Sequence, residues 1–235
     1  MNSFAIVILF LAPYVLSYQM KRKGHHGGGN EPTDFHGEFT NYMRKVQHQA
    51  RMRHNHYRRL HGVPDLKESE ELNRYAQAWA ERLAKTGQFR HRSRSPYGEN
   101  IYMSYNSDPN FKLKGRAPVD SWYSEIKYHN YNSNGFNPKT GHFTQVIWKG
   151  SRWLGTGVAK SRDGKIFVVS NYKPRGNMMG RFRENVPRPN SDGEMQQQNL
   201  VKLISNKNVN TDKLLIRSPC SLALTINSSA VCVIT

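Results

Sequence analysis

Cysteine is scarce in this sequence. Among 235 residues there are only Cys220 and Cys232, both near the C-terminus. Two such cysteines can close one short loop in an oxidising compartment, but they cannot cross-link the rest of the chain. The folded part is therefore expected to be stabilised by the packing of its own core.

Long apolar runs are also absent. A membrane-spanning helix needs about 20 apolar residues, and the longest apolar stretch, residues 4–16, is shorter and is followed by the small Ser17. The pattern predicts a signal peptide over residues 1–17, although its start lacks a Lys or Arg. We expect a secreted, extracellular protein; an uncleaved membrane anchor is the alternative.

Acidic residues are few. Asp and Glu number 17 against 35 Lys and Arg, a formal net charge of +18. Residues 18–35 and 191–235 each carry +1 and residues 1–17 carry none, which leaves +16 on residues 36–190. Such a surplus favours anionic partners, above all anionic membrane surfaces. No nucleic-acid-binding motif accompanies it, so nucleic acid is not an expected partner, and a merely solvated basic surface is the alternative.

Composition divides the remainder of the chain into three segments. Residues 18–35 are rich in Gly, His and Lys and predict a flexible lead-in, residues 36–189 predict the folded domain, and residues 190–235 predict a polar, disordered tail. In the tail, Asn227 begins a glycosylation sequon, and the terminal "CVIT" fits a prenylation box. Export favours glycosylation and disfavours prenylation, which occurs in the cytosol.

Helical patterns dominate the first half of the domain. Apolar residues recur at helical spacing from Phe39 to Leu60. A second helix is predicted from Ser69, a good N-cap, to Gly87. A third is predicted to begin at Pro118 and to bury Val119, Trp122 and Ile126.

The second half indicates strands. Residues 142–149 alternate in polarity and predict a strand, and "GTGVAK" and "KIFVVSNY" flank an Asp-Gly turn and predict an antiparallel hairpin beside it. Together these elements predict an α/β domain in which a small antiparallel sheet is flanked by helices.

Several sequence motifs carry a family resemblance. "HNHYRRLHGVPDL", "GENI", "DSWYSEI", "GHFTQVIWKGS" and "VVSNYKPRGNMMG" occur in this order within residues 36–187. They resemble the CAP superfamily of cysteine-rich secretory, antigen five and pathogenesis-related proteins, most closely its Golgi-associated plant pathogenesis-related branch. The resemblance implies an α-β-α sandwich.

The resemblance also implies a cleft formed by His91, His142, Glu99 and Glu125. In the family the two histidines can bind a divalent metal such as zinc, with the glutamates adjacent. Two imidazoles plus a nearby carboxylate, with one coordination position left open, are a known zinc arrangement, in which a further Glu can orient the bound water. Glu125 is predicted to lie near the buried side of the third helix, where an unpaired carboxylate is costly and a polar partner in the cleft would relieve that cost. The alternative for Glu125 is an exposed glutamate on the flank of the helix. The alternative for His142 is a hydrogen-bonded histidine at the sheet rim.

Two functions of different class follow from the resemblance. The first is a non-enzymatic lipid-, sterol- or membrane-binding module that uses a mobile aromatic loop after the "GEN" motif. Its candidate residues are Tyr102, Met103, Tyr105, Phe111 and Leu113; alternatively these residues pack back onto the domain. The oligomeric state is left open, with a homodimer as one possibility.

The second function is a metal-dependent hydrolase, a protease in which Glu99 or Glu125 activates a metal-bound water. Ser104 lies where a nucleophile has been considered for relatives, but the chain has no GxSxG elbow. Binding is favoured over catalysis, because a shared fold does not establish a shared reaction.

Overall fold

The structure is a computed structural model that describes residues 31–191, 223–226 and 229–232. The predicted signal peptide, Cys220, Asn227 and most of the predicted tail lie outside these residues. Within the described residues, none of the helices combines the length and apolar character that crossing a membrane requires.

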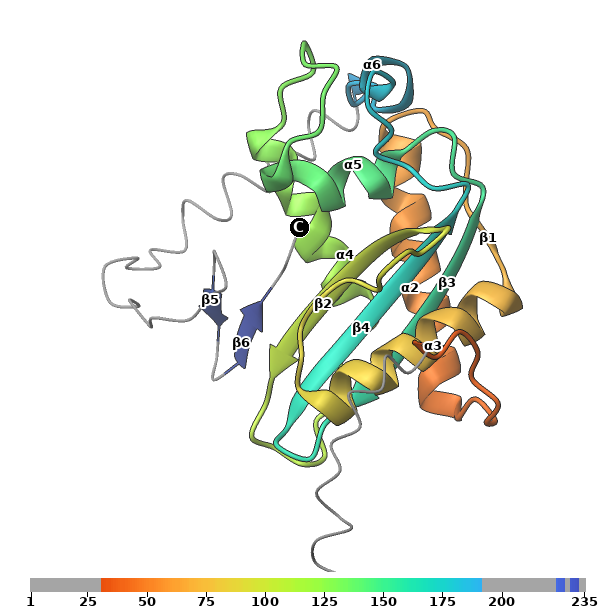
Figure 1. The fold of residues 1–235 in the computed structure, drawn as a ribbon. Helices are drawn as coiled ribbons and strands as arrows, with labels where there is room; N and C mark the ends of the chain where they lie inside the picture. The colour runs from red at the N-terminus through yellow and green to blue at the C-terminus, as the bar shows by residue number, and fades with distance from the viewer. Residues whose placement is uncertain (1–30, 192–222, 227–228, 233–235) are drawn as a thin grey trace, which may run out of the picture. The chain divides into compact units, whose positions relative to one another are not determined.

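One sheet lies between two layers of helices (Figure 1). Its centre is formed by the antiparallel strands β3 (Trp153–Lys160), β4 (Lys165–Lys173) and β2 (Gly98–Tyr105), in that order. The two-residue β1 (Lys67–Glu68) pairs with β3 in parallel, so the sheet is mixed at this edge. The α-β-α sandwich is confirmed, and so is the predicted hairpin, whose turn contains Gly164 at φ +86°.

Two further strands come from the segment that was predicted to be a disordered tail. β6 (Ser229–Cys232) pairs antiparallel with β2, and β5 (Ala223–Ile226) pairs antiparallel with β6. These residues therefore extend the sheet beyond β2, which the polar composition of the tail did not indicate.

Helix α3 (Glu70–Thr86) covers one face of the sheet (Figure 1). It begins and ends as predicted: the Ser69 side chain accepts from the N–H of Leu72, and Gly87 ends the helix at φ +68°. A Cβ atom on Gly157 would lie 2.4 Å from the Cα of Gln77, so only glycine allows the helix backbone to lie this close to β3.

Amide side chains of α3 also bond to the backbone of β3. Asn73 accepts from the N–H of Thr156 at 2.9 Å. Gln77 accepts from the N–H of Val158 at 2.9 Å and donates to the carbonyl of the same residue at 2.9 Å. These bonds fix the position of α3 on the strand, because each buried amide has its partner.

The opposite face is covered by α2 (Asn41–Leu60), α4 (Arg116–Tyr123) and α5 (Gly141–Ile147). α2 starts after Thr40, whose hydroxyl accepts from the N–H of Met43 at 3.2 Å. α4 begins before Pro118 and ends before Glu125, so the third predicted helix is displaced. Glu125 lies in the following 3₁₀ helix η1 (Ser124–Tyr128). Two short elements complete this part, the 3₁₀ helix η2 (Pro138–Thr140) and α6 (Phe182–Asn185).

The strand predicted at residues 142–149 is wrong, because this segment contains helix α5. All residues of α5 are buried, polar ones included, so the alternation in polarity does not mark an exposed face. Thr144 donates to Asn177 Oδ1 at 2.7 Å, and Gln145 accepts from the N–H of Gly176 at 3.0 Å. The polar side chains are therefore buried with hydrogen-bond partners instead of facing water.

Candidate metal centre

The first histidine–glutamate pair lies where the chain leaves α3 and enters β2. Glu99 Oε1 accepts from His91 Nδ1 at 2.9 Å and from the N–H of Arg92 at 3.0 Å. Its Oε2 accepts from Asn171 Nδ2 at 3.3 Å, because Asn171 of β4 lies opposite Glu99 in the strand register. The carboxylate is only 5% exposed, so it is a fixed partner for the imidazole.

The second pair connects η1 to α5. Glu125 Oε1 accepts from His142 Nδ1 at 2.7 Å. Its Oε2 accepts from the backbone N–H groups of His142 and Phe143 at 3.0 and 3.1 Å. A carboxylate at this position satisfies amides that a helix leaves unpaired at its start and complements the partial positive charge there. Glu125 therefore positions the imidazole and the helix that carries it.

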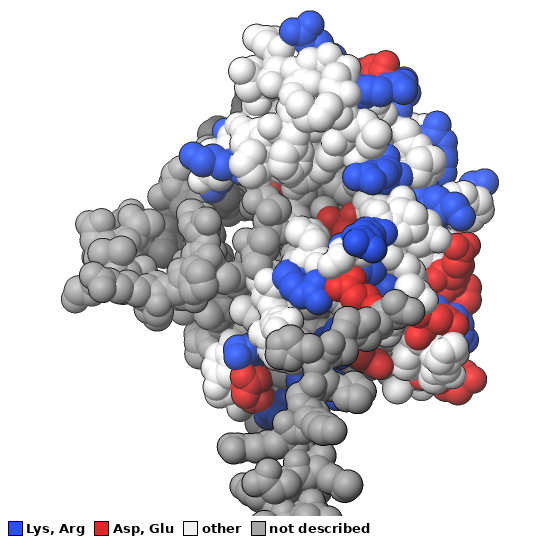
Figure 2. Space-filling view, viewed as in Figure 1, with Lys and Arg blue, Asp and Glu red and all other residues white. Residues whose placement is uncertain are grey.

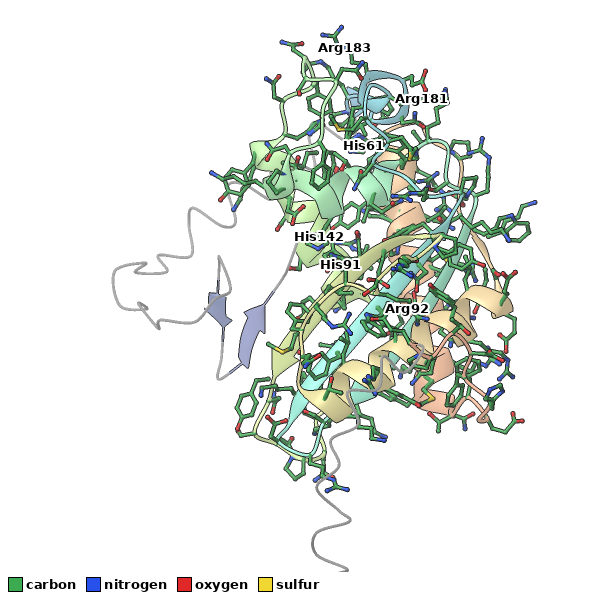
Figure 3. The ribbon with its side chains drawn as sticks, in the orientation of Figure 1. His61, His91, Arg92, His142, Arg181 and Arg183 are labelled. Atoms are coloured by element: carbon green, nitrogen blue, oxygen red, sulfur yellow. The ribbon has the colours of Figure 1, made fainter. Side chains whose placement is uncertain are left out.

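Both pairs leave the same imidazole atom available. A neutral imidazole that donates from Nδ1 to a carboxylate has an unprotonated Nε2 that can accept a bond or bind a metal. In His142 this Nε2 is buried and has no hydrogen-bond partner among the described residues. His91 is more accessible, with 37% of its side chain exposed. Figure 3 shows both labelled histidines in the region between α5 and β2.

A hydrogen-bonded chain joins His142 to the helix layer behind it. Asn100, next to Glu99 in sequence, donates to the carbonyl of His142 and to the Tyr172 hydroxyl, each at 3.1 Å. Tyr172 in turn donates to His54 Nε2 at 2.7 Å. Burial lowers the pKa of His54 to about 3, so its imidazole is neutral and can accept this bond. Sequence reasoning missed this chain, since only the strand register brings Asn100 and Tyr172 together.

Each of the two imidazoles has the chemistry of a metal ligand. An unpartnered, buried Nε2 and carboxylate-backed imidazoles are typical of metal-binding histidines. The described residues contain no group of three His, Cys, Asp or Glu side chains placed to hold a metal. Glu99 and Glu125 are thus partners of the histidines, and that His91 and His142 share one ion remains a prediction.

Arg92 is a further residue of this region that sequence reasoning missed (Figure 3). Its guanidinium lies 3.7 Å from the centre of the Tyr75 ring and donates to the Tyr75 carbonyl at 2.6 Å. Burial lowers its pKa. Because its backbone N–H bonds to Glu99, this anchored arginine fixes the segment that carries His91.

The residues expected to bind lipid are not together in a mobile loop. Tyr102 and Leu113 belong to the buried core, Met103 and Phe111 are partly buried, and only Tyr105 is well exposed. The first two aromatic positions, Tyr102 and Tyr105, lie on β2 instead of in a loop. Ser104 is also buried on this strand, out of reach of a substrate.

Comparison with known proteins shows which family the sequence matches. Residues 52–172 match the CAP family, described as the cysteine-rich secretory protein family. The chain is 44% identical over 142 residues to the Golgi-associated plant pathogenesis-related protein 1 of Homo sapiens, covering 58% of this chain and 88% of that protein.

Two other similarities cover different shares of the relatives. The chain is 34% identical over 151 residues to the Secreted protein RBT4 of Candida albicans, of which it spans only 39%. Among solved structures it is similar to BmVAL-1, with 24% identity, a TM-score of 0.49 and coverage of 62% of this chain and 82% of that one. On the family match and the identity to the human relative, this chain belongs to the CAP family.

Proposed function

We propose that the protein is an exported, non-enzymatic CAP module that binds anionic lipid membranes, and that His91 and His142 hold a divalent metal such as zinc. The observation that carries the membrane proposal is the uncompensated basic charge of the folded residues. Residues 36–190 carry a net charge of +16. Lys114, Arg116 and Lys149 are exposed, and no carboxylate of the described residues lies within ion-pair distance of them. Basic side chains near an anionic membrane contribute about 1 kcal/mol each.

The charge distribution on one face supports this proposal. Figure 2 shows Lys and Arg spread widely over this face, whereas the acidic side chains gather mainly at its right-hand edge. A surface of this kind attracts anionic lipids over a broad area without a deep pocket.

An exposed apolar cluster is followed in the sequence by the exposed basic residues Arg181 and Arg183. Phe136, Met178 and Met179 are exposed, Met179 by 71%. Their two loops are joined where the Asn134 side chain donates to the carbonyl of Gly180 at 2.7 Å. Apolar side chains at a loop tip can enter the interfacial region of a bilayer. We call Phe136, Met178 and Met179 the apolar tip.

The geometry of the carboxylates favours binding over hydrolysis. Both oxygens of Glu99 accept hydrogen bonds from protein donors, and so do both oxygens of Glu125. A general base must be free to take a proton from water, and these carboxylates are instead engaged in holding imidazoles and helix amides. The hydrolase alternative therefore has the weaker support.

A metal would have a structural role in this proposal. Nε2 of His91 and Nε2 of His142 would hold the ion, and Glu99 and Glu125 would orient the two rings. Bound there, the ion would supply a positive centre that joins the segment after α3 to α5, and water would complete its coordination.

Export rests on the first 17 residues and on the relatives. Their apolar pattern is that of a signal peptide. One relative is named a secreted protein and another is named Golgi-associated, and both names are compatible with entry into the secretory pathway.

Vesicle sedimentation tests the membrane proposal. The full chain should bind vesicles of phosphatidylcholine mixed with phosphatidylserine, bind pure phosphatidylcholine weakly, and dissociate as salt is raised. Met178→Ser with Met179→Ser should weaken binding, whereas Trp153→Ser, a similar change at an exposed site elsewhere, should not. Equal binding to neutral and anionic vesicles would contradict the proposal.

The metal proposal has its own measurement. Calorimetric titration with zinc should show binding that is lost when His91 and His142 are both replaced by Ala. Replacement of the exposed His48 by Ala is the control and should leave the titration unchanged. Unaltered affinity in the double variant would remove the site.

A further inference from the structure

A second candidate site lies away from the histidine–glutamate pairs, between α2 and the segment that leads into α4. The structure has a cavity of about 520 Å³ there that is open to solvent. One wall consists of α2 residues, among them His48, Arg53 and His56, and the other of Lys114 and Arg116. α2 and α4 lie on the face of the sheet opposite α3 (Figure 1). The volume of this cavity is in the usual range of small-molecule pockets.

The cavity wall has a surplus of positive charge. Arg53 pairs with Asp120, and its guanidinium also donates to the Tyr57 hydroxyl at 2.8 Å. Lys114 and Arg116 are exposed, and among the described residues no carboxylate lies within ion-pair distance of either one. The charge of Arg53 is therefore compensated, and those of Lys114 and Arg116 are available to a ligand.

The second wall is held at a fixed distance from α2. The N–H of Gly115, between the two basic residues, donates to Gln49 Oε1 at 2.8 Å. A Cβ atom on Gly115 would lie 2.3 Å from the carbonyl oxygen of Val46, so only glycine permits this approach. The cationic groups are consequently placed around the cavity before any ligand arrives, which reduces the entropy cost of binding.

The start of α4 adds to the same field. Arg116 is its first residue, and the helix has neither an acidic residue in its first turn nor a side-chain cap. A helix start without an acidic side chain retains its partial positive charge. The helix and the two basic side chains therefore favour the same class of ligand.

We propose that this cavity binds the phosphate group of a phosphate ester. A phosphate dianion offers several acceptor oxygens, which suit the planar guanidinium of Arg116 and the ammonium group of Lys114. The volume exceeds that of a phosphate alone and leaves room for an attached sugar-like ring. The inference goes beyond the proposed function, since the ester can be soluble or can be a lipid headgroup.

Calorimetry on the full chain tests the pocket with soluble probes, namely inorganic phosphate, pyrophosphate and inositol trisphosphate. Lys114→Ser with Arg116→Ser should weaken binding of inositol trisphosphate at least tenfold. Lys149→Ser with Arg175→Ser removes the same charge from exposed positions outside the cavity and should change the affinity less than twofold. Equal losses in the two double variants, or no binding by the unaltered chain, would overturn the proposal.

Gly115→Ala tests the geometry with all charges kept. The added methyl group should displace the wall from α2 and weaken inositol trisphosphate binding at least threefold, with circular dichroism as the check on folding. Unchanged affinity in a folded Gly115→Ala protein would contradict the role given to the wall. If this variant does not fold, the charge variants alone decide.

Vesicles carrying phosphatidylinositol bisphosphate distinguish the two sources of the ester. A lipid headgroup is supported if the protein binds these vesicles more tightly than inositol trisphosphate and if the Lys114/Arg116 variant loses the vesicle binding. Equal affinity for the vesicles and for inositol trisphosphate supports a soluble ester. Vesicle binding that persists in this variant, without binding of any soluble ester, overturns the pocket and leaves the proposed membrane function intact. Binding of a soluble ester without any vesicle binding supports the pocket and contradicts the proposed membrane function.

Discussion

Two buried histidines should make the stability of the fold depend strongly on pH. His54 donates from Nδ1 to a backbone carbonyl at 2.8 Å and accepts from Tyr172, and burial lowers its pKa to about 3. His61 donates to the carbonyl of Pro187 at 2.7 Å and accepts from the Tyr123 hydroxyl at 2.9 Å; burial lowers its pKa to about 4. Both imidazoles are satisfied only in the neutral form.

The sign of the effect follows from proton binding. In the unfolded chain these imidazoles take up protons as the pH falls through their ordinary pKa of 6.5. In the folded protein His61 stays neutral down to about pH 4 and His54 down to about pH 3, because burial lowers the pKa of each. Protons therefore stabilise the unfolded state, and the free energy of unfolding falls with falling pH. Between pH 7 and pH 5 each histidine accounts for a loss of about 2 kcal/mol, and the pair for about 4 kcal/mol. That is a large fraction of the 5–15 kcal/mol typical of a domain.

Urea unfolding of the full chain at pH 7, 6 and 5 measures this loss. His54→Gln and His61→Gln should each be less stable at pH 7 but should each remove about 2 kcal/mol of the pH dependence. His48→Gln, at an exposed position of α2, should keep the dependence of the unaltered protein. The reasoning is refuted if stability is constant from pH 7 to 5, or if both buried variants retain the full dependence.

Two substitutions test buried hydrogen bonding. Arg58→Lys should lower the free energy of unfolding by about 3 kcal/mol. The reason is that the Arg58 guanidinium donates to four backbone carbonyls, which one ammonium group cannot reach together. Arg59→Lys, at an exposed position, is the control and should change the free energy of unfolding by less than about 0.5 kcal/mol. Glu125→Gln should cost about 1–2 kcal/mol in urea unfolding and weaken zinc binding about tenfold, while exposed Glu184→Gln should do neither. Equal effects within either pair would contradict the assignment.

Local signals in the sequence predicted much of the fold. Ser69 and Gly87 bound α3 because a cap and a left-handed residue act within a few positions of themselves. The Asp163–Gly164 turn likewise set the hairpin of β3 and β4. The alternation from His142 onward misled, because it assumes that polar residues face water, and in α5 they are buried.

The candidate site was predictable only in part. The resemblance singled out two histidines and two glutamates, and the structure pairs His91 with Glu99 and His142 with Glu125. That each carboxylate would be fully engaged could not be predicted, since it depends on the approach of Asn171 across the sheet and of the α5 amides. Arg92 was missed for a similar reason: a basic residue in a basic sequence gives no sign of being buried.

The amide bonds from α3 to β3 bear on how the protein avoids self-association. Asn73 and Gln77 occupy backbone groups of β3 on the side away from β4, where an incoming strand from another molecule would otherwise pair. Exposed strand edges are common starting points for aggregation. β1 pairs with β3 only at Trp153 and Leu154, and beyond these residues α3 occupies the edge. The growth of the β-sheet between copies of the protein is therefore disfavoured along this part of β3.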